Sequence, residues 1–491
     1  MAEEARAVSD PLLMAVDLGS SFLKTALFNR QGRLVAGARR AYTERRPATG
    51  QIEQDPDEWL TLVADTLEEF REAGIQTARV AGLGLSARGA NAIFIDDGGA
   101  VLAPCWLDRR ASTAAQELAR QVGADLDYQT RRLASNTYHF RRQFPDAFPR
   151  LAHPLFVKDF LLYRLTGAIA TDPSSGPPNG VWPARLWDAV GVPVARLPPV
   201  RPHTDVGGTL TAGAAEQLGL TAGLPVGIGG HDGACANIGA GAILPGQSCL
   251  TIGTQGVART IASRPPVHAR ERRISPYHFL PGRWCCSGDL PRLGAAPTMV
   301  AQLLVGGATP GEEPNAALTE AATQVAPGAG GVLYLPFPSG QICPELRPDA
   351  RAGFLGMAAD TARSQLYRAA LEGTAYAFRS AIERQQEIGL RVDDIRLSGG
   401  GAQNQLWAQI LADVLNAPLT VVEPEEGARG AAMLLAVAIG WFRSVEDVAA
   451  AWLRPAARYT PSADAVPYER LYRRFRYMAD AVYAAERSAP A

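Results

Sequence analysis

Two segments of this 491-residue chain share one form, and together they limit the folds it can adopt. Residues 12–28 and 248–258 each contain an apolar run, a short turn of small residues and a second apolar run. This pattern predicts two buried β-hairpins and indicates a weak internal repeat. Because strand-like runs alternate with helical patterns elsewhere, we predict an α/β protein of two similar halves, with a boundary near residues 245–247.

Apolar spacing predicts the other main elements. Residues at helical intervals predict helices at 59–73, 361–388, 403–415, 427–439 and 468–485. Short apolar runs predict strands at 79–85, 92–95, 225–230, 330–336 and 395–397. The stretch 166–210 is rich in Pro and Gly, so we predict ordered loop there with one short helix at 184–190.

The overall charge argues against a polyanion-binding protein. Lys and Arg total 48 and Asp and Glu total 49, so the summed field favours neither nucleic acid nor an anionic membrane. The polar start of the chain, residues 1–6, lacks the features of a secretory signal, and no apolar run is long enough to span a membrane. Six sparse cysteines without a CxxC pair predict reduced thiols and no zinc centre. We therefore expect a cytoplasmic protein.

One glycine motif matches a dinucleotide-binding pattern but does not indicate such a site. Residues 82–87 match the GxGxxG/A pattern of dinucleotide-binding proteins after a strand. That motif requires a helix next, but here a polar stretch and another strand follow. No GxxxxGK[ST] string occurs, so a P-loop site is excluded as well.

The first hairpin turn has the residues of a phosphate site. Main-chain N–H groups near a glycine can converge on an anion, and hydroxyls add donors; a nearby carboxylate can hold Mg²⁺ directly or through water. The residues concerned are Asp17, Gly19, Ser20, Ser21 and Lys24. Alone, the pattern is equally that of an ordinary turn whose Asp bonds local backbone. The similar turn at Gly253 and Thr254 favours a pair of phosphate-binding turns, one in each half.

Two further strand ends carry candidate groups. Gly399 and Gly400 lie between a strand and a helix, where small residues admit a flat ligand and the helix N-terminus favours negative charge. The alternative for these glycines is tight packing of strand against helix. Asp232 follows the strand at 225–230, on what reads as a flexible turn where open α/β sheets place reactive groups. A turn Asp with a purely structural role is the alternative for Asp232.

Taken together, these segments resemble the FGGY family of carbohydrate kinases, within the actin, heat-shock protein and hexokinase superfamily. Residues 158–167 with Thr171-Asp172 resemble its KDYLxxxLTG…TD segment, and residues 335–356 resemble its LPYLSGER-P…G-F-G stretch. Residues 397–409 resemble its adenosine motif. Residues 106–109 resemble its Trp-x-Asp-x-Arg region, read here as one residue short before the Arg. The resemblance covers nearly the whole chain in order.

The resemblance implies a fold and a set of roles. The fold would be two RNase H-like, actin-like ATPase domains, 1–246 and 247–491, with a catalytic cleft between them. The first would hold the sugar, one phosphate loop and the catalytic base; the second would hold the other phosphate loop and adenosine. Asp232 would be the general base and Asp17 would organise Mg²⁺. ATP would be bound by Asp17, Gly19, Ser20, Ser21, Lys24, Gly253, Thr254, Gly399, Gly400, Gln403 and Asn404.

The sugar side departs from the family pattern. By resemblance, the acceptor would contact Arg88, Gly89, Trp106, Asp108, His231 and Asp232. Xylulokinases of the family usually carry Gly-Gln-Met-His-Gly where this chain has residues 86–91. Arg88 either bonds hydroxyls or a carboxylate through its fork of donors, or is a surface residue. His231 either shapes the sugar site or is a loop histidine without a ligand role.

The expected activity is ATP-dependent phosphorylation of a small sugar or polyol, with a xylulokinase-like ketose kinase as the first reading. The alternatives are a tetritol, hexulose or aldonate as acceptor, or a nucleotide-switched binding module of the same superfamily. The partners expected are a small-molecule acceptor, ATP and Mg²⁺, with no nucleic acid and no membrane. A homodimer is left open.

Overall fold

The chain forms two compact units in the computed structural model, which describes residues 10–89, 91–123, 128–306 and 314–488. Unit 1 comprises residues 1–241, 277–281 and 425–453, and unit 2 comprises residues 242–276, 282–424 and 454–491. The polar start of the chain lies outside the described residues. The predicted domains are consecutive, with a boundary at residue 246. Residues 425–453 belong to unit 1 although they follow that boundary in the sequence, and the boundary itself stays a prediction.

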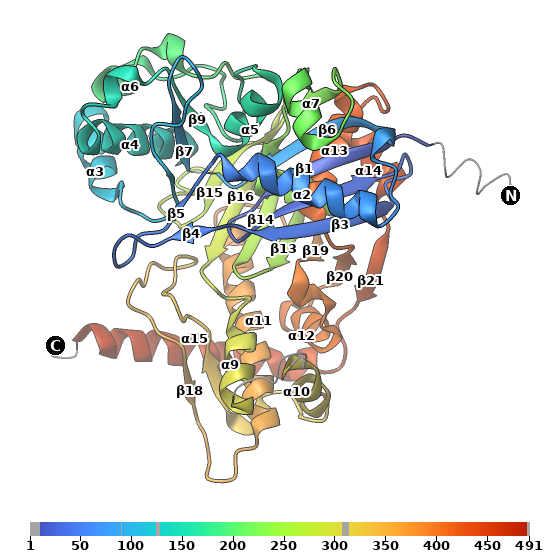
Figure 1. Cartoon of the computed structure of the whole chain (residues 1–491). Helices are drawn as coiled ribbons and strands as arrows, with labels where there is room; N and C mark the ends of the chain where they lie inside the picture. The colour runs from blue at the N-terminus through green and yellow to red at the C-terminus, as the bar shows by residue number, and fades with distance from the viewer. Residues whose placement is uncertain (1–9, 90, 124–127, 307–313, 489–491) are drawn as a thin grey trace, which may run out of the picture. The chain divides into compact units, whose positions relative to one another are not determined.

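Unit 1 is built on a mixed sheet whose central strand is β1 (Leu12–Leu18). Its strands follow the order β10 (Val206–Thr209), β11 (Pro225–Gly227), β6 (Val80–Ala87), β1, β2 (Phe22–Phe28) and β3 (Leu34–Ala41), with β12 (Gly230–His231) also on β6. β1 pairs with β2 antiparallel and with β6 parallel, and Figure 1 shows β1 and β3 in blue in the same layer. The predicted hairpin at 12–28 and strand at 79–85 are confirmed.

Alternate residues of β1 and β6 face different helices. Leu12, Met14, Val16 and Leu18 join one hydrophobic cluster with α2 (Glu58–Glu72) and α5 (Val157–Thr166). The other face meets α13 (Glu426–Ala438), where a Cβ added at Gly84 would lie 2.5 Å from the carbonyl oxygen of Ala431. Close packing of β6 against α13 thus requires Gly84, while a Cβ at Gly82 would lie 2.9 Å from the Pro225 carbonyl oxygen of β11, so packing explains both glycines of the GxGxxG/A match.

Helix α13 also packs against α8 (Asp232–Ala240) through glycine. A Cβ at Gly239 would lie 1.8 Å from the Glu426 carbonyl oxygen, and one at Gly430 would lie 1.9 Å from that of Cys235. The backbones therefore touch at both places. The remaining elements of unit 1 are α3 (Ser112–Val122), α4 (Tyr128–Gln143), α6 (Ala184–Val190), α7 (Ala212–Leu218), α14 (Val445–Trp452), β4 (Glu44–Arg45), β5 (Glu53–Gln54), β7 (Ala92–Ile95), β8 (Cys105–Trp106) and β9 (His153–Phe156).

Unit 2 repeats the central pairing of unit 1. Strand β13 (Gln247–Ile252) pairs antiparallel with β14 (Gly256–Ala262) and parallel with β19 (Asp394–Ser398). The sheet continues through β16 (Arg283–Leu290) at one side and through β20 (Leu419–Val422) and β21 (Pro455–Tyr459) at the other. The second predicted hairpin is confirmed, and both hairpins stand at the centre of their sheets. Strand β15 (Ser275–Leu280) lies partly in unit 1.

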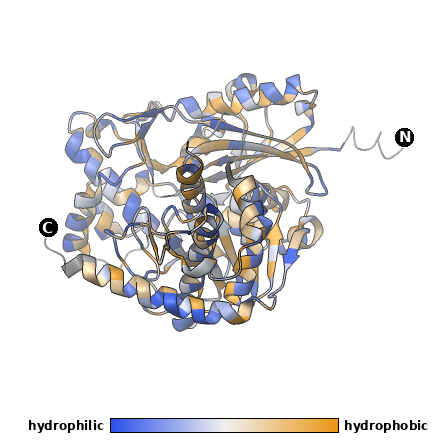
Figure 2. Ribbon diagram, turned by 90° about the horizontal axis from the view of Figure 1, so that it is seen from below, coloured by the Kyte–Doolittle hydropathy of each residue, from blue (hydrophilic) through white to orange (hydrophobic). Residues whose placement is uncertain are grey.

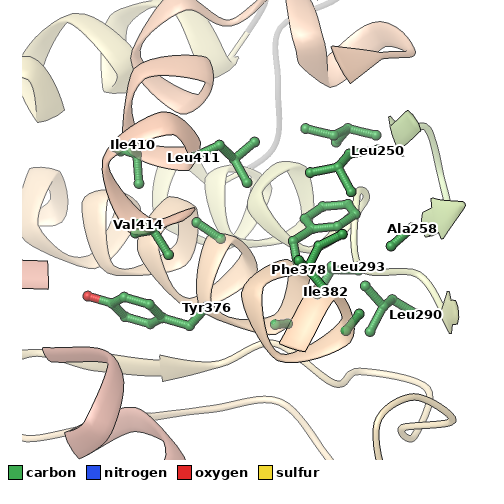
Figure 3. Close-up of a cluster of buried hydrophobic side chains, with 14 of the residues drawn as sticks. Leu250, Ala258, Leu290, Leu293, Tyr376, Phe378, Ile382, Ile410, Leu411 and Val414 are labelled. Carbon is green, nitrogen blue, oxygen red and sulfur yellow. The ribbon is translucent and has the colours of Figure 1, made fainter. Parts of the chain in front are cut away.

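Long helices build the core of unit 2. Figure 3 shows Phe378 and Ile382 of α11 (Arg363–Glu387) among Leu250, Leu290 and Leu411, while the Tyr376 hydroxyl points away from this group. The other elements are α9 (Ala296–Val305), α10 (Pro314–Thr323), α12 (Gln405–Leu415), α15 (Ala465–Ser488), β17 (Leu333–Leu335) and β18 (Gly353–Leu355). The helix that leads to the C-terminus carries both hydrophobic and hydrophilic residues in Figure 2. Within the described ranges, no helix is long and apolar enough to cross a membrane.

Most predicted helices differ from the structure only at their ends. The strand predicted at 330–336 is shorter, Leu333–Leu335, and the helix predicted from residue 403 begins at Gln405 after a 3₁₀ turn, Gly400–Gln403. The placement of Asp232 on a flexible turn is wrong, because this residue begins α8. The small residues that follow Asp232 suggested a turn, but they serve the close approach of α13.

The contact between α8 and α13 can be tested by adding one methyl group. We expect Gly430→Ala to lower the free energy of unfolding by about 1–3 kcal/mol, because its Cβ would overlap the Cys235 carbonyl. Urea unfolding measures the effect. Gly213→Ala in α7 is the control, since nothing lies within 4 Å of its Cβ, and it should leave stability unchanged or raise it by up to about 1 kcal/mol. Equal stability of the two variants would contradict the contact.

Candidate active site

The first predicted phosphate turn joins the ends of β1 and β2. Gly19 N–H donates to the carbonyl oxygen of Phe22 at 3.1 Å, while Ser20 and Ser21 are exposed. The register pairs Asp17 with Lys24 across the hairpin, and the Lys24 ammonium lies 3.3 Å from the Glu425 carboxylate. The turn therefore offers exposed hydroxyls that could donate to an anion, while the half-buried Lys24 ammonium is paired with Glu425.

Asp17 is the buried carboxylate of this end of the sheet. It is 7% exposed, accepts a hydrogen bond from the Ser86 hydroxyl at 2.7 Å, and lies against Gly427 at the start of α13. Burial raises its pKa to about 6, although Lys24 and Ser86 act in the opposite direction. Burial of the Asp17 carboxylate thus outweighs the charge of Lys24 and the hydrogen bond from Ser86. A divalent cation that keeps several waters fits one such carboxylate, and the described residues contain no cluster of three or more His, Cys, Asp or Glu that would enclose a metal.

Asp232 is the first residue of α8, and His231 caps that helix. The Gly233 N–H donates to Asp232 Oδ1 at 2.6 Å and to His231 Nδ1 at 3.2 Å. Since Nδ1 accepts, the neutral imidazole carries its proton on Nε2, which lies 3.2 Å from Asp232 Oδ1. His231 therefore lies beside the Asp232 carboxylate and caps the helix that Asp232 begins, and its role toward a ligand stays a prediction.

Strand pairing brings these carboxylates to one edge. In the parallel ladders, Asp17 lies opposite Ser86 and His231 lies opposite Ala87, so β1, β6 and β12 all end there. Open α/β sheets place their reactive groups at this carboxyl edge.

A buried ionic network supports the segment that carries Asp232. Lys158 Nζ lies 2.7 Å from Asp159 Oδ1 and 3.3 Å from Asp172 Oδ2, and all three side chains are buried. Burial would raise the pKa of Asp172, but Lys158 and His203 outweigh it and the pKa lies well below its usual range. Asp172 accepts from the Ser174 hydroxyl, whose oxygen accepts from the His231 N–H at 3.0 Å. The motif that begins at Lys158 thus anchors the start of α8.

Arg88 is buried, so the surface alternative is wrong. Its guanidinium donates to the Gly19 carbonyl at 2.7 Å and to Gln54 Oε1 at 2.6 Å. The rings of Tyr42 and Trp59 lie 5.1 and 5.2 Å from its central carbon. Arg88 therefore stabilises the predicted phosphate turn through the Gly19 carbonyl, and two of its nitrogens are already bonded inside the protein.

The Trp-x-Asp-x-Arg motif is complete, and reading it as one residue short is wrong. Arg110 is its arginine, donating to Asp108 at 2.6 Å and to Glu53 at 2.7 Å. Partial burial would raise the pKa of Asp108, but the hydrogen bonds from Arg110 and from the backbone outweigh it and bring the pKa to about 2. Trp106 is buried, and its carbonyl accepts from Asn91 at 2.5 Å. Trp106 and Asp108 thus bond to neighbouring residues of unit 1, Trp106 to Asn91 and Asp108 to Arg110.

In unit 2, the second predicted phosphate turn is held closely by glycines. A Cβ at Gly294 would lie 1.9 Å from the Gly253 carbonyl oxygen, and one at Gly399 would lie 2.5 Å from that of Ile252. Gly399 has φ +86°, a conformation that side chains rarely adopt. Ala295 N–H donates to the Thr254 carbonyl at 3.2 Å. Thr254 itself is exposed, so its hydroxyl is accessible to a ligand.

The predicted adenosine residues surround the start of α12. Gly400 has open space where its Cβ would be, and Gln403 is exposed. Asn404 caps the helix by accepting from the Trp407 N–H at 3.0 Å, and its amide donates to Thr319 at 3.0 Å. Packing explains Gly399, whereas Gly400 and Gln403 are free to meet a ligand.

Sequence reasoning missed several residues at the edge of unit 1. Arg110 could have been found by counting the motif correctly. Gln54, Gln129, Ser174 and Tyr277 carry no motif, and only the folded chain brings them to Arg88 or His231.

The buried charge of Asp17 gives a testable cost. Its folded pKa of about 6 exceeds the unfolded value, so the ionised carboxylate destabilises the fold above pH 6, and this cost vanishes once both states are protonated. We expect Asp17→Asn to be more stable than wild type by about 2–3 kcal/mol at pH 8, with the gap closing as pH falls from about 6 to 4. Denaturant unfolding at pH 8 and pH 4.5 measures it. The control Asp188→Asn, at an exposed position, should have the stability of wild type at both pH values. If the stability difference between Asp17→Asn and wild type is the same at both pH values, the buried charge of Asp17 is refuted.

Comparison with known proteins matches both halves of the chain. Residues 12–239 match the FGGY family of carbohydrate kinases, N-terminal domain, and residues 249–439 match its C-terminal domain. The xylulose kinase of Bacillus subtilis is 28% identical over 94% of this chain and 95% of its own. The gluconokinase of the same organism is 25% identical over 92% of each chain.

Solved structures agree with the sequence matches. The xylulose kinase of Rhodospirillum rubrum superposes with a TM-score of 0.84 and 28% identity, over 96% of this chain and 99% of that one. The gluconate kinase of Lactobacillus acidophilus, at 20% identity and a TM-score of 0.85, shares the fold over 97% of this chain and 99% of its own. The expected α/β fold of two FGGY domains is confirmed. The chain belongs to the FGGY family of carbohydrate kinases, enzymes that use ATP as the phosphoryl donor.

Proposed function

We propose that this sugar kinase transfers the γ-phosphoryl group of Mg-ATP to a hydroxyl of a ketose, with xylulose as the first acceptor. The observation that carries the proposal is the Asp232 carboxylate, which accepts from the Gly233 N–H and lies beside His231 at the carboxyl edge of the unit 1 sheet. Its side chain is 34% exposed, so a substrate hydroxyl can reach it. Xylulose kinases among the relatives support the acceptor.

In this reaction Asp232 is the general base. A carboxylate oxygen of Asp232 takes the proton of the acceptor hydroxyl as that oxygen attacks the γ-phosphorus, and the bond to the β-phosphate oxygen breaks. The products are a phosphate monoester and ADP, and the proton on Asp232 passes to solvent. His231 Nε2 lies 3.2 Å from Oδ1 of the same carboxylate, so the imidazole limits where that carboxylate can move.

The other residues bind and orient. Gly19, Ser20, Ser21 and Lys24 would bind phosphate oxygens, as would Gly253 and Thr254 of unit 2, while Gly399, Gly400, Gln403 and Asn404 would meet adenosine. Asp17 would hold Mg²⁺ through its carboxylate and bound water. Mg²⁺ supplies neutralisation of the phosphate charge that grows during transfer.

On the sugar side, Gly89, His231 and Asp232 would contact the acceptor, and Arg88, Trp106 and Asp108 would position their neighbours. An aldonate is the second candidate because gluconokinases are also relatives. The bonds of Arg88 to Gly19 and Gln54 favour a neutral ketose, since the cation that the sequence offers for a carboxylate is already engaged. A homodimer, a cytoplasmic location and domains 1–246 and 247–491 stay predictions from the sequence.

A coupled assay of ADP release tests the proposal. Acceptors would include xylulose, other ketopentoses, hexuloses, gluconate and erythritol, with a sugar-free control for background hydrolysis. We expect xylulose to give the highest kcat/KM. If no acceptor raises ADP release above the control, the kinase proposal fails; if gluconate ranks first, the ketose assignment is wrong.

Replacing the base tests its role. Asp232→Asn should lower kcat by about 10²–10⁴, because general-base catalysis contributes that factor, while ATP binding measured by calorimetry persists. Asp188→Asn, at an exposed position of α6, is the matched control and should keep wild-type turnover. Near-normal turnover of Asp232→Asn would rule out Asp232 as the base.

A further inference from the structure

Gly89 is enclosed by two side chains from distant parts of unit 1. A Cβ at this position would lie 2.4 Å from His231 Cδ2 and 2.5 Å from Gln129 Nε2. His231 precedes Asp232 at the start of α8, and Gln129 lies in the first turn of α4. The absence of a side chain at Gly89 thus allows the imidazole and the amide to approach each other over the backbone.

Gln129 is a buried residue with an unsatisfied hydrogen-bond acceptor. It is 4% exposed, and its Oε1 has no hydrogen-bond partner among the residues that the structure describes. Burying an unsatisfied amide oxygen costs about 1–3 kcal/mol, and most buried polar atoms in folded proteins have a partner. A hydroxyl of a bound molecule would supply the missing donor.

The position of Gln129 relative to the base suits a small sugar. His231 Nε2 lies 2.7 Å from the same Cβ position at Gly89 and 3.2 Å from Asp232 Oδ1. The Gln129 amide and the His231 imidazole therefore both lie against Gly89, and the imidazole also lies against the Asp232 carboxylate. A chain of a few hydroxylated carbons can place one hydroxyl at Asp232 and another at Gln129.

We propose that Gln129 determines acceptor specificity by accepting, at Oε1, a hydrogen bond from a sugar hydroxyl other than the one phosphorylated. This inference rests on the proposed kinase function. The inference requires that the acceptor carry a second hydroxyl, positioned to donate to Gln129 Oε1. A site built to bond a hydroxyl discriminates against an analogue that lacks it, because the buried amide is then left unpaired.

The test compares Gln129→Met, Gln129→Ala and the control Gln143→Leu, which changes an exposed glutamine at the end of the same helix. With the preferred acceptor of the wild type, both Gln129 variants should raise the sugar KM by about 10- to 100-fold, with the KM for ATP unchanged. Gln143→Leu should match wild type in both constants.

Deoxy analogues give a readout that a structural role would not move. Wild type should lose activity toward the analogue that lacks the hydroxyl bound by Gln129, whereas Gln129→Met should treat that analogue and the parent sugar alike. An unchanged sugar KM, an equal penalty in both proteins, or loss of ATP binding in both Gln129 variants would each overturn the inference. Failure of the kinase function itself would be seen separately, as wild-type ADP release that no acceptor stimulates.

Discussion

The hydrogen bonding of β1 along both edges is the constraint on which unit 1 depends. The antiparallel ladder with β2 sets the predicted phosphate turn and places Asp17 opposite Lys24, and the parallel ladder with β6 brings Ser86 to the same carboxylate. A shift of either register by one residue would turn Asp17 away from α13 and into the apolar face. The small side chains of β6 then let α13 and α8 close over this edge, which positions Asp232.

Unit 2 repeats this strand arrangement around its own predicted phosphate turn. Strand β13 lies between an antiparallel and a parallel neighbour, as β1 does, and its turn is again formed by small residues. The tight contacts of Gly294 and Gly399 hold backbone atoms of that turn, and Gln255 Oε1 accepts from the Arg292 N–H at 2.6 Å. Unit 1 instead bonds its turn to the buried guanidinium of Arg88, so the two related turns differ in what a substitution can disturb.

Features set by neighbours in sequence were predictable, and features set by distant neighbours were not. Both hairpins follow from apolar runs and small turn residues, and the family motifs identified Asp17, Asp232 and the glycine turns as candidates. The role of Arg88 was not predictable because its partners Gln54 and Gly19 are 34 and 69 residues away. Gln129 was missed because only the folded structure makes it a candidate, by burying its amide beside Gly89.

The late return of the chain has a consequence for biosynthesis. Residues 425–453 belong to unit 1, although nearly all of the rest of that unit ends at residue 241. A ribosome therefore completes the β1 and β6 strands long before it makes the helix that covers them. The nascent protein must keep that face of the sheet from aggregating while unit 2 is translated, so its folding yield should depend on chaperone protection of an unfinished first half.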